Sequence, residues 1–273
     1  MNTSFIKWTD EAYGKHERQK FDLAVPKDRG CHGLILFIHG GAWIAGDKEG
    51  YRDDLDRWAI RGYAAAAMNY RYIAPNAQMD AEMEDIKNAL AAIREKAKEA
   101  GADLTRVLLT GTSAGGHLSL LYAYSMAETS PIRPACVVDY CGPTLLSEHG
   151  LLYETPGKYP PAEQWTALFS NLTGRAVVPG NEAEFMPLLE EYSPVTHVTG
   201  NSVPTIICHG QKDDLVPFSQ AKILRDRLEE CGVEYVFLPM PEAGHGLEQA
   251  EIYRESAALF EIYAERFLKE AEA

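Results

Sequence analysis

The sequence is poor in basic residues. Lysine and arginine together number 26, against 40 aspartates and glutamates, so the formal net charge is −14. A surface of that charge repels phosphate backbones and anionic lipid headgroups. We therefore expect neither nucleic acid nor a membrane as a partner, and the excess of acid mainly indicates solubility.

Cysteine is also scarce, and its pattern excludes two kinds of framework. The count is odd and no two cysteines form a CxxC pair, so neither a disulfide scaffold nor a structural zinc site is expected. Buried free thiols in a reducing compartment are the simpler interpretation. The five cysteines are Cys31, Cys136, Cys141, Cys208 and Cys231.

Long apolar runs are missing as well. No stretch approaches the roughly 20 apolar residues of a membrane span, and the first ten residues have no apolar segment of signal-peptide length. A cytoplasmic location is the resulting expectation. The sequence has no HExxH, no His and carboxylate cluster at i, i+4 spacing and no GxGxxG after a strand, so we expect neither a metal nor a nucleotide cofactor.

What the chain does have is enough apolar material for one large core: 46% of 273 residues. Short apolar runs alternate with longer segments of helical periodicity, which is typical of βαβ units. We predict a single α/β domain over residues 1–273, with a mostly parallel sheet covered by helices on both faces. The predicted parallel strands are 34–38, 64–68, 107–109, 135–138, 205–208 and 235–238, and residues 6–8 and 21–25 are predicted to form an antiparallel pair. The predicted helices are 54–61, 79–99, 115–127, 219–231 and 248–269.

Residues 142–203 interrupt this alternation. The interval has several prolines and glycines, no clear strand, and a set of large aromatic side chains. Connections of this length in a compact domain are usually functional, so we interpret it as a small helical insertion near the active site that could line the substrate pocket. An irregular surface excursion without substrate contact is the alternative. The aromatics are Tyr153, Tyr159, Trp165, Phe169 and Phe185.

Ser113 is the candidate nucleophile. It stands in Gly-Thr-Ser-Ala-Gly at 111–115, a GxSxG motif, directly after a predicted strand and before a predicted helix. Glycines on both sides allow a sharp turn that exposes the serine hydroxyl, and the helix N-terminus lies where negative charge would develop. An ordinary glycine-rich turn is the alternative interpretation, and the strand and helix around the motif argue against it.

A second motif, His39-Gly-Gly-Ala-Trp43, follows the predicted strand 34–38 and resembles an HGGG-type oxyanion loop. Acyl transfer creates an oxyanion, which preorganised backbone N–H groups stabilise. The expected donors are the amides of Gly41, Ala42 and Ala114. A tight exit from the strand with no chemical role is the alternative.

A serine nucleophile needs a base, and His245 is the strongest candidate. It is flanked by glycines at 244 and 246 and follows the last predicted strand, which fits the order serine, acid, histidine. The alternative is a loop histidine with local hydrogen bonds only. The orienting acid should follow an earlier strand, and the residues leave Asp213, its neighbour Asp214 and the more distant Asp139 open.

These motifs together resemble the α/β-hydrolase superfamily, in particular the esterase and lipase group related to hormone-sensitive lipase and the bacterial acetyl and xylan esterases. The likeness extends over nearly the whole chain. The HGxxDxxVP pattern of this fold matches 209–217 and implies Asp213 as the acid. Asn69-Tyr-Arg-Tyr72 with Ala-Pro at 74–75 is similar to the NYRLAPE segment, and we interpret it as packing near the oxyanion loop. Alanine at the third position of HGGG departs from the family but keeps the backbone amide.

The resemblance implies a serine carboxylic-ester hydrolase of the α/β-hydrolase fold that works through an acyl-enzyme, with Ser113, Asp213 and His245 as its triad. The expected partner is a small-molecule ester with a short acyl chain, such as an acetylated sugar or xylan. A formamidase or peptidase with the same triad is the second hypothesis. A non-catalytic small-molecule receptor on this fold is the third, disfavoured because all three triad candidates are present. Assembly into a homo-oligomer is left open.

Overall fold

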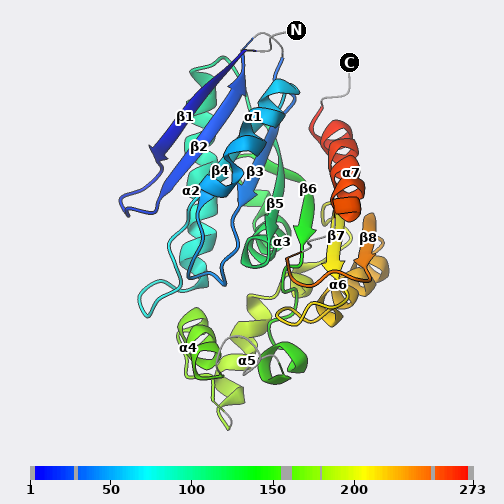
Figure 1. Ribbon diagram of the computed structural model, residues 1–273. Helices are drawn as coiled ribbons and strands as arrows, with labels where there is room; N and C mark the ends of the chain where they lie inside the picture. The colour runs from blue at the N-terminus through cyan, green and yellow to red at the C-terminus, as the bar shows by residue number, and fades with distance from the viewer. Residues whose placement is uncertain (1–3, 28–29, 155–161, 179, 247–249, 270–273) are drawn as a thin grey trace.

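The computed structural model describes residues 4–27, 30–154, 162–178, 180–246 and 250–269, which form an eight-stranded sheet covered by helices (Figure 1). The order across the sheet is β1-β2-β4-β3-β5-β6-β7-β8. The two strands at the start pair antiparallel, β2 also pairs antiparallel with β4, and the remaining pairs are parallel. The strands are β1 (Phe5–Ala12), β2 (Lys20–Pro26), β3 (Leu34–Ile38), β4 (Ala64–Met68), β5 (Arg106–Thr112), β6 (Arg133–Tyr140), β7 (Thr205–Gly210) and β8 (Tyr235–Met240).

The central strands are buried on both faces, as their uninterrupted apolar sequences predict. Every residue of β3 and β4 is buried. The alanines at 64–67 leave room for helices to approach β4 closely, while their neighbours on β3 are large and branched. The predicted mostly parallel sheet and the antiparallel pair at its start are therefore confirmed.

Two layers of helices cover the sheet. The helices α1 (Arg52–Ile60) and α7 (Ala250–Leu268) contribute to the core on one face, with Trp58 and Phe260 in contact at 5.0 Å between ring centroids. On the other face lie α2 (Met79–Lys98), α3 (Ala114–Ser125) and α6 (Ser219–Glu230). The sequence predicted each of these helices to within about two residues at either end. Four of them carry an apolar stripe, whereas α3 is buried on all sides from Ala114 to Ala123.

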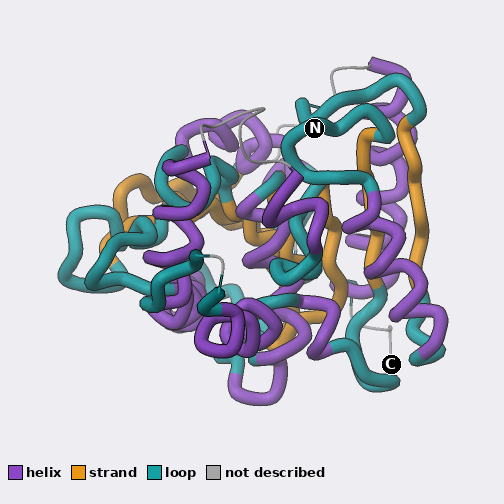
Figure 2. The backbone as a smooth tube through the Cα atoms, turned by 90° about the horizontal axis from the view of Figure 1, so that it is seen from below, coloured by secondary structure: helices purple, strands orange, loops and turns teal. Residues whose placement is uncertain are grey.

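The interval after β6 is largely helical, as predicted. It has a π-helical turn, η3 (Gly150–Glu154), two helices, α4 (Ala162–Thr173) and α5 (Glu182–Glu191), and a 3-10 turn, η4 (Pro194–His197). Figure 1 shows α4 and α5 beyond the carboxyl ends of the parallel strands, and Figure 2, seen from below, shows helices and loops gathered at this end. The helices of this interval thus lie at the carboxyl-end edge of the sheet.

The aromatic side chains of this insertion are mostly core residues. Trp165, Phe169 and Phe185 are buried, whereas Tyr153 is exposed. Tyr159 lies outside the described residues. The three buried rings hold the insertion together and leave little aromatic surface for a substrate.

Two further expectations bear on the environment of the protein. All five cysteines are free; Cys136, Cys141 and Cys208 are buried, and the other two are half-buried. Among the residues that the structure describes, no helix combines the length and the apolarity that crossing a membrane requires.

The remaining short elements are 3-10 turns. One, η1 (Lys48–Tyr51), precedes α1, and the other, η2 (Ala127–Thr129), follows α3. Lys48 in η1 is buried, and its Nζ lies 2.7 Å from Asp10 Oδ1 and 2.8 Å from Asp22 Oδ1. These ion pairs join the start of α1 to the antiparallel strands. They belong to the scaffold.

Candidate functional site

Ser113 occupies a strained turn between β5 and α3. Its φ of 58° and ψ of −123° fall outside the regions that a side chain with a Cβ ordinarily adopts. The turn is held by the Ser113 N–H, which donates to the carbonyl of Tyr140 at the end of β6 (2.8 Å). Strain of this kind persists only where the surroundings enforce it, and it is found at functional sites. Within the described residues, the Ser113 hydroxyl has no hydrogen-bond partner, so it is available.

The glycines of the GxSxG motif are required by packing. A Cβ at Gly111 or at Gly115 would overlap the carbonyl oxygen of Ile38, the last residue of β3. Both backbones therefore pass directly against the end of β3. This close approach brings the turn at Ser113 to the loop that leaves β3.

That loop contains the candidate oxyanion donors. Its backbone is left-handed at Gly41 (φ 111°), Ala42 (φ 50°) and Trp43 (φ 60°). A Cβ at Gly40 would lie 2.6 Å from the carbonyl oxygen of Thr112 and 3.4 Å from Ser113 Cβ, so the loop touches the serine turn. Gly40 admits no larger residue without displacing one of them.

The N–H groups of the candidate donors are not used in other hydrogen bonds within the described part of the chain. In the described part of the chain, the amides of Gly41 and Ala42 make no internal hydrogen bond. Ala114 is the first residue of α3, and an N–H in the first turn of a helix has no intrahelical acceptor. Ala114 follows Ser113 in the chain, and Gly41 and Ala42 follow Gly40, which lies against the serine turn.

The segment after β4 supports the oxyanion loop, as the sequence predicted. Tyr70 stacks on the ring of His39 (4.3 Å between centroids) and its hydroxyl donates to the carbonyl of His39 (2.9 Å). Arg18 donates to the carbonyls of Tyr70 (3.0 Å) and Gly46 (3.1 Å) and stacks on Tyr72. Arg18 could not be predicted from the sequence, because it lies in a polar loop far away in the chain.

Asp213 and His245 form a pair. His245 Nδ1 lies 2.7 Å from Asp213 Oδ2. Asp213 Oδ1 accepts hydrogen bonds from the backbone N–H groups of Leu215 (3.0 Å) and Val216 (2.8 Å), which hold the carboxylate at the end of β7. The loop of His245 is joined to the same place, since the Lys212 N–H donates to the carbonyl of Ala243 (3.0 Å).

The electrostatics of this pair suit a base and its orienting acid. Burial by itself would raise the pKa of Asp213, but hydrogen bonds from His209 and His245 outweigh it and hold that pKa well below its ordinary value. Asp213 is therefore ionised at neutral pH and accepts a hydrogen bond from the Nδ1–H of His245. The lone pair on His245 Nε2 is then left to accept a proton.

Of the other two acids that the sequence left open, neither reaches His245. Asp214 is exposed, and no contact between it and His245 is present among the described residues. Asp139 is fully buried at the end of β6; its Oδ1 accepts from the Gly142 N–H (3.0 Å), and burial raises its pKa to about 7. Tertiary contact thus singles out Asp213, the residue that the HGxxDxxVP pattern implied.

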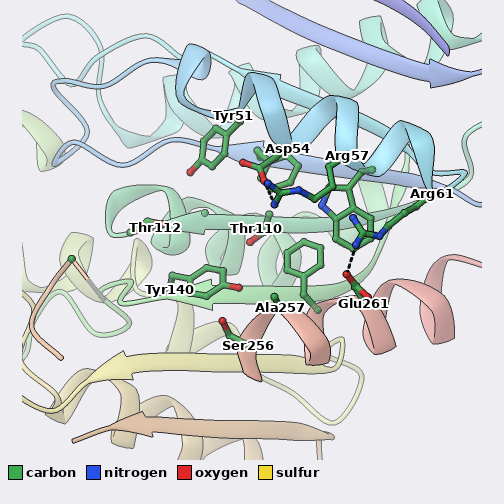
Figure 3. Close-up of a pocket in the computed structure, with 15 residues that line it drawn as sticks. Tyr51, Asp54, Arg57, Arg61, Thr110, Thr112, Tyr140, Ser256, Ala257 and Glu261 are labelled. Atoms are coloured by element: carbon green, nitrogen blue, oxygen red, sulfur yellow. Dashed lines mark hydrogen bonds and ion pairs between the residues drawn. The ribbon is translucent and has the colours of Figure 1, made fainter. Parts of the chain in front are cut away.

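A cavity of about 270 Å³ lies behind the serine turn, between α1 and α7 (Figure 3). Its lining includes Thr112, the residue before Ser113, and Gly246, the residue after His245. The two loops of the candidate site therefore share one wall. Arg57 is paired with Asp54 and Arg61 with Glu261 at its rim (3.0 and 2.8 Å). Ser113 and His245 are not part of its lining.

One group of side chains has metal-ligating atoms close together. Cys141, His209 and Asp213 each bring one such atom within 4.8 Å of the others. Burial raises the pKa of the Cys141 thiol well above its ordinary value, so the thiol stays protonated and is a poor ligand. Asp213 is already bound by His245 and two amides. We assign these residues no metal-binding role.

The fold and the site define a class of protein, and comparisons with known proteins name it. The chain has the α/β-hydrolase fold. A family model described as BD-FAE matches residues 21–228. The chain belongs to this family, which is part of the α/β-hydrolase superfamily.

Two relatives from Mycobacterium tuberculosis are similar over most of this chain. Esterase LipC is 29% identical over 250 residues, covering 86% of this chain and 59% of LipC. The probable carboxylic ester hydrolase LipM is 30% identical over 278 residues, covering 97% of this chain and 61% of LipM. The chain therefore spans about three fifths of the length of these relatives.

Solved structures agree on the fold. A truncated carbohydrate esterase from gut microbiota superposes with a TM-score of 0.76 at 21% identity, covering 97% of this chain and 98% of that one. Esterase B from Lactobacillus rhamnosis (HN001) gives a TM-score of 0.74 at 24% identity, covering 95% and 85%. At these identities the likeness extends to the fold alone.

Proposed function

We propose that the protein is a serine carboxylic-ester hydrolase that acts through an acyl-enzyme. The observation that carries the proposal is the hydrogen-bonded pair of Asp213 and His245, 2.7 Å apart, at the same sheet edge as the strained turn of Ser113. Family membership and relatives named as esterases support the same reaction class.

In the first half of the reaction, Ser113 Oγ forms a bond to the acyl carbon while His245 Nε2 takes the hydroxyl proton. The carbonyl π electrons move onto the oxygen, which the amides of Gly41, Ala42 and Ala114 bind. The oxyanion collapses, the bond to the alcohol oxygen breaks, and His245 returns the proton to that oxygen. An acyl-serine and a free alcohol result.

Water completes the cycle by the same steps. His245 takes a proton from water as the water oxygen bonds to the acyl carbon, and the second oxyanion occupies the same amides. Its collapse breaks the bond to Ser113 Oγ, which takes the proton back, and the carboxylic acid leaves. Asp213 stays ionised throughout and stabilises the imidazolium form of His245.

Short acyl esters of sugars, including acetylated xylan, are the substrate class that we propose. The support is the family, the carbohydrate-esterase neighbour in fold, and Ala42, whose methyl group narrows the space beside the oxyanion. Rates on acetylated sugars, on aryl esters of increasing chain length and on N-formyl amides would separate this class from a formamidase or peptidase.

Residues 1–273 are proposed as one domain, with residues 142–203 as an insertion beside the site. Phe169 of α4 contacts Trp43 of the oxyanion loop (6.4 Å between ring centroids), which supports that placement. A reducing compartment such as the cytoplasm is proposed from the five free thiols.

The decisive test is covalent labelling. A fluorophosphonate probe should label the wild-type protein at Ser113, and Ser113→Ala should abolish both labelling and turnover of an aryl acetate. Turnover by the Ser113→Ala protein at the wild-type rate would overturn the assignment. A folded wild-type protein that the probe does not label would instead favour a receptor on this fold.

A further inference from the structure

A second imidazole lies against the candidate acid. His209 is the fifth residue of β7 and is fully buried. Its Nε2 donates to the carbonyl of Val216 (2.9 Å) and lies 3.4 Å from Asp213 Oδ2. A carbonyl oxygen accepts only, so Nε2 carries a proton. The same nitrogen faces Asp213 Oδ2, and the interaction with His209 lowers the pKa of Asp213. Asp213 Oδ2, which accepts the hydrogen bond from His245, thus faces two imidazole rings.

The rest of the Asp213 carboxylate is held by backbone. Oδ1 is bound by the N–H groups of Leu215 and Val216, and neither of these two bonds is made to Oδ2. The direction of Oδ2 decides how well the acid is aligned with His245 Nδ1. Among the described residues, two side chains contact Oδ2: His245 and His209.

We infer that His209 is a positioning residue, which holds Asp213 Oδ2 toward His245 through its Nε2–H while Val216 fixes the plane of its own ring. This inference rests on the proposed function, because it assigns a role within the same triad. His209 touches neither the substrate nor Ser113. It acts through Asp213.

Asp139 is a second carboxyl group near His209. Asp139 on β6 pairs with Ile207 on β7, and His209 lies two residues after Ile207. The side chains of Asp139 and His209 are therefore on the same face of the sheet. Burial raises the pKa of Asp139 to about 7, so at neutral pH much of it is uncharged and offers His209 less negative charge.

Two further titratable groups near Asp139 and Asp213 are uncharged at neutral pH. Burial raises the pKa of the Cys141 thiol and of the Tyr124 hydroxyl, so both stay protonated. Tyr124 reaches this region from α3. His209 Nδ1 and Asp139 Oδ2 have no hydrogen-bond partner among the described residues. In the proposed reaction Asp213 stays negatively charged, and His245 gains and then loses a proton.

Two substitutions of similar polarity test the role. The amide nitrogen of His209→Gln can reach the position of Nε2, whereas that of His209→Asn reaches only the position of Nδ1. We expect Gln to keep kcat within about threefold of wild type. Asn should lower kcat about 10- to 100-fold, the rate equivalent of one hydrogen bond to a charged group, and leave KM nearly unchanged.

Two readouts separate positioning from packing. With Asn, the acid limb of the kcat/KM profile should move to lower pH, because a misaligned carboxylate stabilises the His245 imidazolium less. The low-field proton resonance of the Asp213–His245 hydrogen bond should shift upfield with Asn and stay in place with Gln. Equal kcat, equal acid limbs and unmoved resonances in folded Gln and Asn proteins would overturn the inference.

Asp139→Asn provides the matched control, since it keeps a neutral group of the same shape. It should retain kcat within about threefold at pH 7. A loss as large as that of His209→Asn would contradict a role specific to the contact between His209 and Asp213. Fluorophosphonate labelling of the wild type distinguishes the two levels of failure: without labelling at Ser113 the proposed function falls, and with it only the role of His209 is at issue.

Discussion

Trp43 Nε1 donates a hydrogen bond to His117 Nδ1 at 3.2 Å, and this bond joins the oxyanion loop to the helix that follows the nucleophile. The other ring nitrogen of His117 donates to the carbonyl of Tyr192, just after α5 (2.8 Å). Since a carbonyl only accepts, Nε2 carries the proton and Nδ1 is left as the acceptor for Trp43. One buried, neutral histidine thus connects the loop, α3 and the insertion.

Trp43→Phe should impair activity more than stability. Phenylalanine keeps much of the ring but removes the donor, so the loop loses its bond to α3 and the amides of Gly41 and Ala42 lose their alignment. We expect kcat on an aryl acetate to fall about 10-fold with a small change in KM.

Trp165→Phe is the control for that change. Trp165 is also buried and also donates through Nε1, to the carbonyl of Leu151 (3.0 Å), but it lies within the insertion. It should lower the midpoint of thermal unfolding without lowering kcat. Equal kcat for Trp43→Phe and wild type would rule out a role for the Trp43 bond in catalysis.

Asp213→Asn should lower kcat by roughly 10³- to 10⁴-fold, because an amide can present its NH₂ to His245 and favour the wrong tautomer. Asp214→Asn, one residue away and exposed, should stay within about twofold of wild type. Steady-state kinetics on an aryl acetate, with circular dichroism to verify folding, measure both. The reverse ranking of the two variants would transfer the acid role to Asp214.

Gly40→Ala should inactivate the protein by displacing the oxyanion loop from the serine turn. Its Cβ would lie 2.6 Å from the carbonyl oxygen of Thr112, and neither backbone has room to yield. Gly50→Ala is the matched control, since no atom lies within 4 Å of its Cβ position. Labelling of Ser113 by a fluorophosphonate should slow at least 10-fold in Gly40→Ala alone. Labelling of Gly40→Ala at the wild-type rate would contradict this packing.

Protonation of His117 should lower stability as the pH falls from about 6.5 to about 4, against the opposite effect of buried Asp139, whose pKa is raised to about 7. Burial lowers the pKa of His117 to about 4, so over this range the unfolded chain binds a proton that the folded chain does not. This single group contributes on the order of 3 kcal/mol, fully present above pH 6.5 and lost toward pH 4. Burial lowers the pKa of His39 to about 4 as well, which adds a loss of the same sign.

Urea unfolding between pH 4 and pH 7 measures this dependence. The slope of the unfolding free energy against pH is proportional to the number of protons taken up on unfolding. In the middle of this range, His117→Gln should take up about one proton fewer than the wild type, and this holds even if the variant is less stable. Identical slopes for the variant and the wild type would show that His117 is not the group that titrates.

Much of the fold was predictable because its signals are local. The apolar runs at 34–38 and 64–68 predicted β3 and β4 to the residue, since strands buried on both faces have no polar alternation to blur their ends. The helix after Ser113 was predicted from the glycines of its motif. The strands β5 and β6 are longer than predicted, because their pairing with each other extends beyond their apolar residues.

The sequence by itself determined the order of the candidate residues along the chain and the turn at Ser113, because glycine spacing and strand ends are encoded within a few residues. Tertiary structure decided the rest. It brought His245 to Asp213 and not to Asp214, buried Asp139, turned Trp165, Phe169 and Phe185 inward, and set His209 against the acid. Each of these depends on which strands and loops become neighbours in space, and that is a property of packing between segments far apart in the chain.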